Sequence, residues 1–204
     1  RDTFGAEAAN QDLEIVYEGT FTADTQADFS VQLTAAQSAG ADVVFLPIYY
    51  QPASVILSQA NAMGYAPTFF GVDGMDGILT MPNFDLSLAE GVMVLTPFSA
   101  DATDEKTVNF VAEYNERFGE TPNQFAADGY DCVYALKQAL EAAGCTPDMS
   151  TEDICTAMIE QFTTMTFDGL TGTGMTWTSG GEVSKMPLAV VIQDGVYVSA
   201  ENAG

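Results

Sequence analysis

The sequence contains no histidine, and only 5 of its 204 residues are lysine or arginine, against 29 aspartates and glutamates. Without an imidazole the chain cannot form a Ser-His-Asp or Cys-His catalytic centre, and histidine-ligated zinc, haem and iron sites are excluded as well. Its three cysteines are too few for a four-cysteine zinc site. The net charge of −24 repels nucleic acids and anionic membrane surfaces. We therefore expect no enzyme, no cofactor and no nucleic-acid partner.

Long apolar runs are also missing, so no segment is expected to cross a membrane. The sequence begins at Arg1, without a methionine or a signal peptide, in what reads as the middle of a helix, and we expect a fragment of a longer protein. Apolar residues make up 47% of the chain, which is enough for a core. The acidic surface suits a protein that faces the external medium, although adaptation to high salt gives a similar composition.

Over the first hundred residues, short apolar runs that favour strands alternate with segments of helical spacing. The expected strands are 13–17, 43–46, 68–71 and 91–96. The expected helices are one that ends near 6–9, one over 28–40, and one with Pro52 in its first turn that ends before Gly64. The unbroken apolar run 43–46 is typical of a strand buried on both faces. Repeated β-α-β units predict an α/β fold with a parallel sheet flanked by helices.

The pattern changes after Pro97, where three helices and then antiparallel strands are predicted. The helices are expected from Thr103 to Phe118, from about Asn123 to Ala143, and from Ser150 to Phe162. The strands are expected over 173–178, 186–193 and 196–198, the last two joined by an Asp-Gly turn. The chain thus divides into an α/β part and a part rich in helices.

The three cysteines divide into a pair and a single residue. Cys145 and Cys155 flank the loop between the last two helices, at a separation that a disulfide could close in an oxidising compartment. The alternative is two reduced thiols without a role. Cys132 lies within the long helix among apolar residues and is expected to be a buried small hydrophobe.

Two acids stand out because they follow a predicted buried strand. Asp73 and Asp76 lie in the glycine-rich segment 71–77, at the carboxyl end of the strand 68–71. Open α/β sheets bind ligands at this end of their strands. Asp73 is therefore either an anchor for a cationic group of a ligand or an aspartate that only stabilises a turn.

Two tyrosines occupy the equivalent place one strand earlier. Tyr49 and Tyr50 follow the strand 43–46 and enter the next helix. Their rings and hydroxyl groups can line a pocket, and contact of a ring with an ammonium group would complement Asp73. The alternative is a pair of aromatic residues at a rim or an interface. Because both clusters are expected at one sheet edge, we favour a binding site.

Taken together, several segments of the sequence resemble a known family. Several segments, in family order, are similar to the branched-chain amino-acid-binding (Leu/Ile/Val) proteins, the type I periplasmic solute-binding proteins of ABC importers. The segments that carry the resemblance are 20–29 (TFTADTQADF), 40–45 (GADVVF), Tyr49-Tyr50, 71–74 (GVDG) and 122–131 (PNQFAADGYD). The match is specific in combination, although no single segment is diagnostic.

The resemblance implies two α/β lobes, joined by three hinge strands, that close on a ligand. Residues 1–95 would belong to the second lobe, 96–172 to a hinge crossing and helices of the first lobe, and 173–204 to a return to the second lobe. Hinge crossings are expected over 91–97 and 167–173. The fold would be incomplete, because most of the first lobe, with the signal sequence and any lipid-anchored cysteine, would precede Arg1.

The resemblance also implies roles for four residues. Tyr49 and Tyr50 would line the cleft, Asp73 would bind the α-ammonium of an amino acid, and Phe125 would pack near the ligand side chain. The family has a tyrosine at the position of Phe125, so one hydroxyl is missing here. The implied function is the extracytoplasmic binding subunit of an amino-acid importer, which delivers its ligand to a membrane permease. The alternative is a ligand-sensing domain of a receptor or regulator with the same fold; an enzyme that uses Asp73 and Asp76 lacks a nucleophile.

A fragment of this kind would leave apolar helix surfaces without the sheet that normally covers them. We expect Val111, Tyr114, Val133 and Leu136 to be exposed unless a partner buries them. Self-association of the fragment would be one way to cover these residues.

Overall fold

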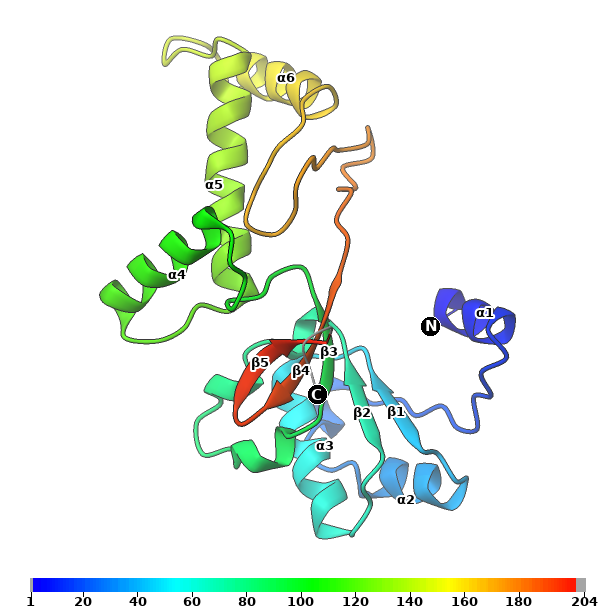
Figure 1. Ribbon diagram of the computed structural model, residues 1–204. Coiled ribbons are helices and arrows are strands. Elements are labelled where there is room, and N and C mark those ends of the chain that lie inside the picture. The colour runs from blue at the N-terminus through cyan, green and yellow to red at the C-terminus, as the bar shows by residue number, and fades with distance from the viewer. Residues whose placement is uncertain (1, 201–204) are drawn as a thin grey trace. The chain divides into compact units, whose positions relative to one another are not determined.

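The computed structural model describes residues 2–200, which form two compact units (Figure 1). Unit 1 runs to Val94 and includes Ile192–Val196, and unit 2 contains Leu95–Val191 and the segment from Tyr197 onward. The chain therefore passes between the units at three points, after Val94, after Val191 and after Val196. Each unit is described below by itself.

Unit 1 is built on parallel β-α-β units, as the sequence predicts. Its elements are α1 (Asp2–Asn10), α2 (Ser30–Ser38), β1 (Val43–Leu46), α3 (Tyr50–Ala62), β2 (Thr68–Gly71) and the first half of β3 (Met93–Thr96). Strand β1 pairs in parallel with β2, and β2 pairs in parallel with β3 (Figure 1). The α/β fold and the parallel sheet are confirmed.

Helices α2 and α3 form where apolar residues recur at helical spacing between residues that favour helix ends. On α2, Leu33 and Ala36 are buried, and Phe29, just before the helix, is buried with them. On α3, Pro52 lies in the first turn, where a missing N–H costs no hydrogen bond, and Ile56 and Ala60 are buried. Both helices thus contribute an apolar face to the core of unit 1.

Unit 2 contains α4 (Glu105–Phe118), α5 (Gln124–Ala142) and α6 (Thr151–Phe162). The side chains of Asp104, Asn123 and Ser150 cap these helices by accepting backbone N–H groups at 3.0, 3.2 and 3.1 Å. The sequence predicts the three helix starts to within two residues, although the cap of α4 is Asp104 and not the expected Thr103.

The core of unit 2 consists of two separate apolar clusters. Around Phe98, Ala127 and Leu170, the side chains of α4 and α5 pack together, and Phe110 lies edge-on to Phe98. The second cluster joins Ala135 of α5 to residues that follow α6, with partly buried aromatic rings beside it; its buried members are Ala135, Phe167 and Met175. Small alanines on α5 therefore let neighbouring segments approach the helix closely.

The C-terminal hairpin forms as predicted. Strands β4 (Leu188–Gln193) and β5 (Val196–Ser199) complete a five-stranded sheet in the order β1-β2-β3-β4-β5. Asp194 and Gly195 join them with φ values of 52° and 76°, the left-handed conformation that a two-residue hairpin turn requires. Among the described residues, no helix is long and apolar enough to cross a membrane.

Three strand predictions need correction. The run 13–17 forms no strand: Leu13 is 62% exposed, and the segment lacks a pairing partner in the described sheet. Residues 173–178 form only single antiparallel bridges, through Met175 and Trp177. Strand β1 exists, but it is the outermost strand of the sheet and its first residue, Val43, is 54% exposed. The strand is therefore not buried on both faces.

The cysteine predictions also need correction. Cys145 and Cys155 are both free, so the predicted disulfide is not formed, and Cys155 lies on the exposed side of α6. Cys132 is exposed as well, because the buried stripe of α5 runs through Ala127, Asp131 and Ala135 and passes it by. Apolar neighbours in the sequence therefore did not indicate burial at this position.

The division into units differs from the expected lobes after the first crossing. The first crossing falls after Val94, close to the expected boundary at residue 95, but residues 173–191 cluster with unit 2. The segment 167–173, expected to be a hinge crossing, lies wholly within unit 2, where the Asp131 carboxylate of α5 accepts hydrogen bonds from it.

Of the four apolar side chains on the helices of unit 2 that are expected to be exposed, two are. Val133 is 64% exposed and Leu136 is 45% exposed. Val111 and Tyr114 are half-buried: Val111 packs on the Phe98 cluster, and Tyr114 contacts neighbouring rings of α4. Of these four residues, the two exposed ones thus lie on α5.

Replacement of the α4 cap gives a test of this fold that depends on pH. The backbone N–H of Thr107 donates a hydrogen bond to the carboxylate of Asp104. This bond holds the pKa of Asp104 below its usual value. A depressed pKa stabilises the fold above the unfolded-state pKa, and this contribution disappears as the pH falls through the folded-state pKa. We expect Asp104→Ala to lower the free energy of unfolding by about 1 kcal/mol at pH 7.

Urea unfolding of both proteins at pH 7 and pH 3 measures this difference, which should shrink at the lower pH. Asp104→Asn is the control, because asparagine caps a helix without ionising and should keep most of the stability. A deficit of Asp104→Ala that is the same at both pH values would contradict the role of the carboxylate.

Candidate functional site

The register of the sheet brings two chain segments together at the edge formed by the carboxyl ends of β1 and β2. Leu46, the last residue of β1, is the register partner of Gly71, the last residue of β2. Because the strands are parallel, the segments 47–50 and 72–77 leave the sheet side by side. This edge is the place where open α/β sheets bind ligands, as expected for Tyr49, Tyr50 and Asp73.

The glycines of the segment 71–77 allow it to lie directly on the two tyrosines. A Cβ atom at Gly74 would lie 2.9 Å from the carbonyl oxygen of Ile48 and 3.4 Å from Cδ1 of Tyr49. A Cβ atom at Gly77 would lie 3.2 Å from Cδ1 of Tyr50, and the φ of Gly77 is 103°. No larger residue fits either place without a shift, so glycine sets the spacing of this edge.

Asp73 and Asp76 have the same local hydrogen bond but different surroundings. Each carboxylate accepts the N–H of the glycine that follows it, at 2.9 Å for Asp73 and 2.8 Å for Asp76. Asp76 is only 4% exposed, whereas Asp73 is exposed. Asp76 is therefore suited to hold the turn, and Asp73 is the acid of this pair that a ligand can reach.

The tyrosines present rings and hydroxyl groups beside Asp73. Tyr49 is the N-cap residue of α3 and is 63% exposed, and Tyr50, in the first helical turn, is half-buried against Gly77. A carboxylate and an aromatic ring both favour a cation, and this edge carries both kinds of group. The edge of unit 1 is thus chemically suited to a small ligand with a positive group.

Phe125, the fourth predicted site residue, belongs to unit 2. It lies in the first turn of α5, just after the capping residue Asn123, and is 40% exposed. The structure brings Tyr49, Tyr50 and the turn that carries Asp73 together within unit 1, whereas Phe125 belongs to unit 2. A shared site that includes Phe125 stays a prediction.

Sequence reasoning missed a polar stripe on α5. Gln124 and Asp131 are 1% and 5% exposed, and Asp128 forms an ion pair with Lys185. A signal for it exists in the sequence, because three polar residues at positions i, i+4 and i+7 lie on one face of an otherwise alanine-rich helix. Asp131 is the clearest case, since a buried carboxylate needs hydrogen-bond partners.

A cavity lies in unit 2, and its lining includes none of the four predicted site residues. It is a cavity of about 360 Å³ lined by residues of α4, α5 and the segment after α6; its charged members are Lys106, Lys137, Glu141 and Asp168. Lys106 donates to the Asp168 carbonyl oxygen, and Lys137 pairs with Glu141 at 3.7 Å. Its two positive charges are matched by two negative ones. No group of potential metal ligands is found among the described residues.

Comparisons with known proteins identify a family and a fold. A family model described as periplasmic binding protein matches residues 1–195. No curated protein sequence matches the chain significantly. Among solved structures, a leucine binding protein, LivK, from Thermotoga maritima is 23% identical with a TM-score of 0.80. The match covers 97% of this chain and 54% of that protein.

Two further solved structures show which ligands proteins of this fold carry. A branched-chain amino acid transporter substrate-binding protein, LivJ, from Streptococcus pneumoniae was solved with isoleucine; it is 24% identical, with a TM-score of 0.76, over 94% of this chain and 53% of that one. A solute-binding protein from R. palustris was solved with benzoate; it is 16% identical, with a TM-score of 0.82, over 98% and 53%. The chain thus spans about half the length of these proteins.

Gly74→Ala tests the close approach at the sheet edge. The added methyl group would overlap the Ile48 carbonyl, so the turn that carries Asp73 must move away from Tyr49. We expect a loss of about 1–3 kcal/mol in the free energy of unfolding, measured by urea denaturation. Gly5→Ala in α1 is the control, because a Cβ atom there meets nothing within 4 Å. Equal stability of the two variants would show that the turn does not need glycine.

Proposed function

Because the chain belongs to the periplasmic binding protein family, we propose that it is part of the extracytoplasmic binding subunit of an ABC importer, which captures an amino acid for delivery to a membrane permease. The family is not enzymatic, in agreement with the missing histidine. The chain has a partial type I periplasmic-binding-protein fold. The ligand and the cellular location are the parts that we propose here.

The observation that carries the proposal is the exposed Asp73 carboxylate beside Tyr49 and Tyr50. Solved proteins of this fold contain leucine, isoleucine or benzoate, so the fold alone does not select a ligand. An amino acid carries an ammonium group that Asp73 can bind, whereas benzoate carries only a negative group that Asp73 would repel. The acid therefore favours an amino acid over an aromatic acid at this edge.

The side chain of the ligand is expected to meet apolar and aromatic groups. Within unit 1, the ring of Tyr49 is available at the edge, and Phe125 of unit 2 is exposed at the start of α5. A phenylalanine offers contact area without a hydrogen bond, which suits a branched or other small apolar side chain. We therefore propose a branched-chain or similarly small amino acid as the ligand.

Asp73→Asn tests the ammonium contact. A charge-assisted hydrogen bond contributes about 1.5–3 kcal/mol to binding. Its loss should therefore lower the affinity for the most tightly bound amino acid by roughly 10- to 100-fold. Thermal unfolding of the full-length protein that carries this chain, with and without common amino acids, measures it. At about 100 times its dissociation constant, a ligand should stabilise the unsubstituted protein by about 2.7 kcal/mol.

Asp24→Asn is the control for net charge, because Asp24 is another exposed acid of unit 1 and lies outside the segments 47–50 and 72–77. Unchanged amino-acid affinity in Asp73→Asn would remove Asp73 from the ammonium role. No stabilisation of the unsubstituted protein by any amino acid would leave the fold in place and favour the ligand-sensing alternative.

Phe125→Ala tests whether unit 2 takes part in binding. Removing the ring should weaken leucine binding by about tenfold, through lost apolar contact, and should leave glycine binding nearly unchanged. Isothermal titration of both ligands against the full-length protein measures the two effects. Phe118→Ala on α4 is the control, because Phe118 is also an exposed ring of unit 2. An equal loss for both ligands would indicate a general fold defect instead.

A further inference from the structure

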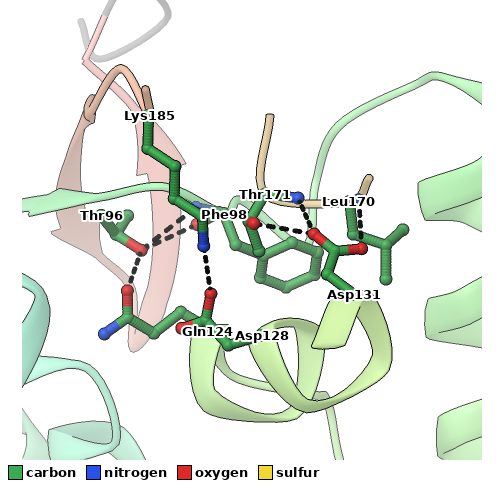
Figure 2. Close-up of polar contacts among 8 residues, drawn as sticks. All are labelled: Thr96, Phe98, Gln124, Asp128, Asp131, Leu170, Thr171 and Lys185. Atoms are coloured by element: carbon green, nitrogen blue, oxygen red, sulfur yellow. Dashed lines mark hydrogen bonds and ion pairs between the residues drawn. The ribbon is translucent and has the colours of Figure 1, made fainter. Parts of the chain in front are cut away.

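One face of α5 is in contact with three separate segments of unit 2. Gln124, Asp128 and Asp131 follow one another at helical spacing, and each binds a different segment (Figure 2). The partners are Thr96, Lys185 and the pair Leu170 and Thr171, which are 28, 57 and 39 to 40 residues away from their α5 partners in the sequence. We call the three α5 residues the anchor stripe.

The first member of the anchor stripe holds the chain just after it leaves unit 1. Thr96 lies two residues beyond Val94, and its hydroxyl donates to Gln124 Oε1 at 3.2 Å. The same hydroxyl accepts the N–H of Phe98 at 3.3 Å. Thr96 is 3% exposed and Gln124 is 1% exposed, so water cannot easily replace this contact. The unit 2 end of the first crossing is therefore fixed to the start of α5.

The second member holds the chain before it returns to unit 1. Lys185 lies six residues before Val191, and its Nζ is 2.6 Å from Asp128 Oδ1 (Figure 2). The two side chains are 28% and 35% exposed. Among the described residues, the other two ion pairs, Arg117–Glu113 and Lys137–Glu141, lie within single helices and are mostly exposed. In this part of the chain, only the Lys185–Asp128 pair links distant segments.

The third member fixes a turn that stays inside unit 2. Asp131 accepts the N–H groups of Leu170 and Thr171 at 2.7 and 2.8 Å, and the Thr171 hydroxyl at 2.7 Å. A Cβ atom at Gly169 would overlap the same carboxylate. Because this contact is buried and complete, it makes α5 and the turn one rigid body. Gln124 and Asp128, which make the other two contacts, thus belong to a helix that Asp131 already fixes to the rest of unit 2.

We propose that the anchor stripe fastens the unit 2 ends of the first two crossings to α5, so that bending between the units is confined to the residues near Val94 and Val191. The units are joined through short crossings, and units joined in this way are expected to move relative to one another. A hinge works when rigid segments border a few residues that absorb the change. Gln124 and Asp128 are accordingly positioning residues.

The three contacts differ in how easily they can be altered. The contacts of Gln124 and Asp131 are buried, so their loss would damage the fold of unit 2. The Lys185–Asp128 pair is partly exposed, so salt and substitution can weaken it without unfolding the unit. The ion pair is therefore the adjustable member of the anchor stripe and the one that an experiment should change.

The test is amide hydrogen exchange of the full-length protein without ligand, read in peptides that cover 183–191. Ser184 donates its N–H to Thr176, which protects it from exchange in the anchored segment. We expect Asp128→Asn to raise exchange there by about fivefold, with little change elsewhere in α5. The reversed pair, Asp128→Lys with Lys185→Asp, should restore protection. Glu141→Gln, which breaks the exposed Lys137–Glu141 pair, is the control.

Unchanged exchange over 183–191 in Asp128→Asn would overturn the proposal, and so would increased exchange spread evenly across α4, α5 and α6. Failure of the reversed pair to restore protection would show that Asp128 does not act through Lys185. A molar concentration of salt should reproduce the effect of Asp128→Asn in the unsubstituted protein. Because no ligand is used, failure here leaves the proposed amino-acid function untouched, and failure of that function leaves this inference standing.

Discussion

The contact between the Gly74 backbone and the Ile48 carbonyl is the constraint on which the candidate site depends. The parallel register of β1 and β2 brings the two loops to one edge, but register alone leaves several ångströms between neighbouring strands. Two glycines close this gap and place the turn against Tyr49 and Tyr50. The turn that carries Asp73 is thereby packed against the two tyrosines.

Much of this arrangement could be predicted from the sequence because its causes are local. Pro52, the capping residues Asn123 and Ser150, and the Asp194-Gly195 turn each act within a few residues of where they stand. The place of Tyr49, Tyr50 and Asp73 at one edge follows from the β-α-β pattern, since parallel strands end on the same side. Their proposed roles in binding, in contrast, rest on a family resemblance and on the chemistry of the side chains.

The features that could not be predicted depend on partners distant in the sequence. The apolar run 13–17 reads as a strand, but a strand also needs a pairing partner, and none is found in the described sheet. Cys132 has apolar neighbours in the chain, yet it faces outward because the buried stripe of α5 follows Asp131 and the alanines. In the same way, nothing near Asp128 indicates Lys185, which lies 57 residues away.

The two units use acidic residues in opposite ways, and the difference follows from burial. In unit 2, Asp131 is buried and all that it binds is protein backbone or hydroxyl, so its charge serves the fold. In unit 1, Asp76 is buried in the same sense, while Asp73, three residues away, remains exposed beside two aromatic rings. In a chain with a net charge of −24, a carboxylate by itself marks no site. What distinguishes Asp73 is its place at the end of a parallel strand, on a turn that glycine alone allows, where a cationic group can approach from solvent.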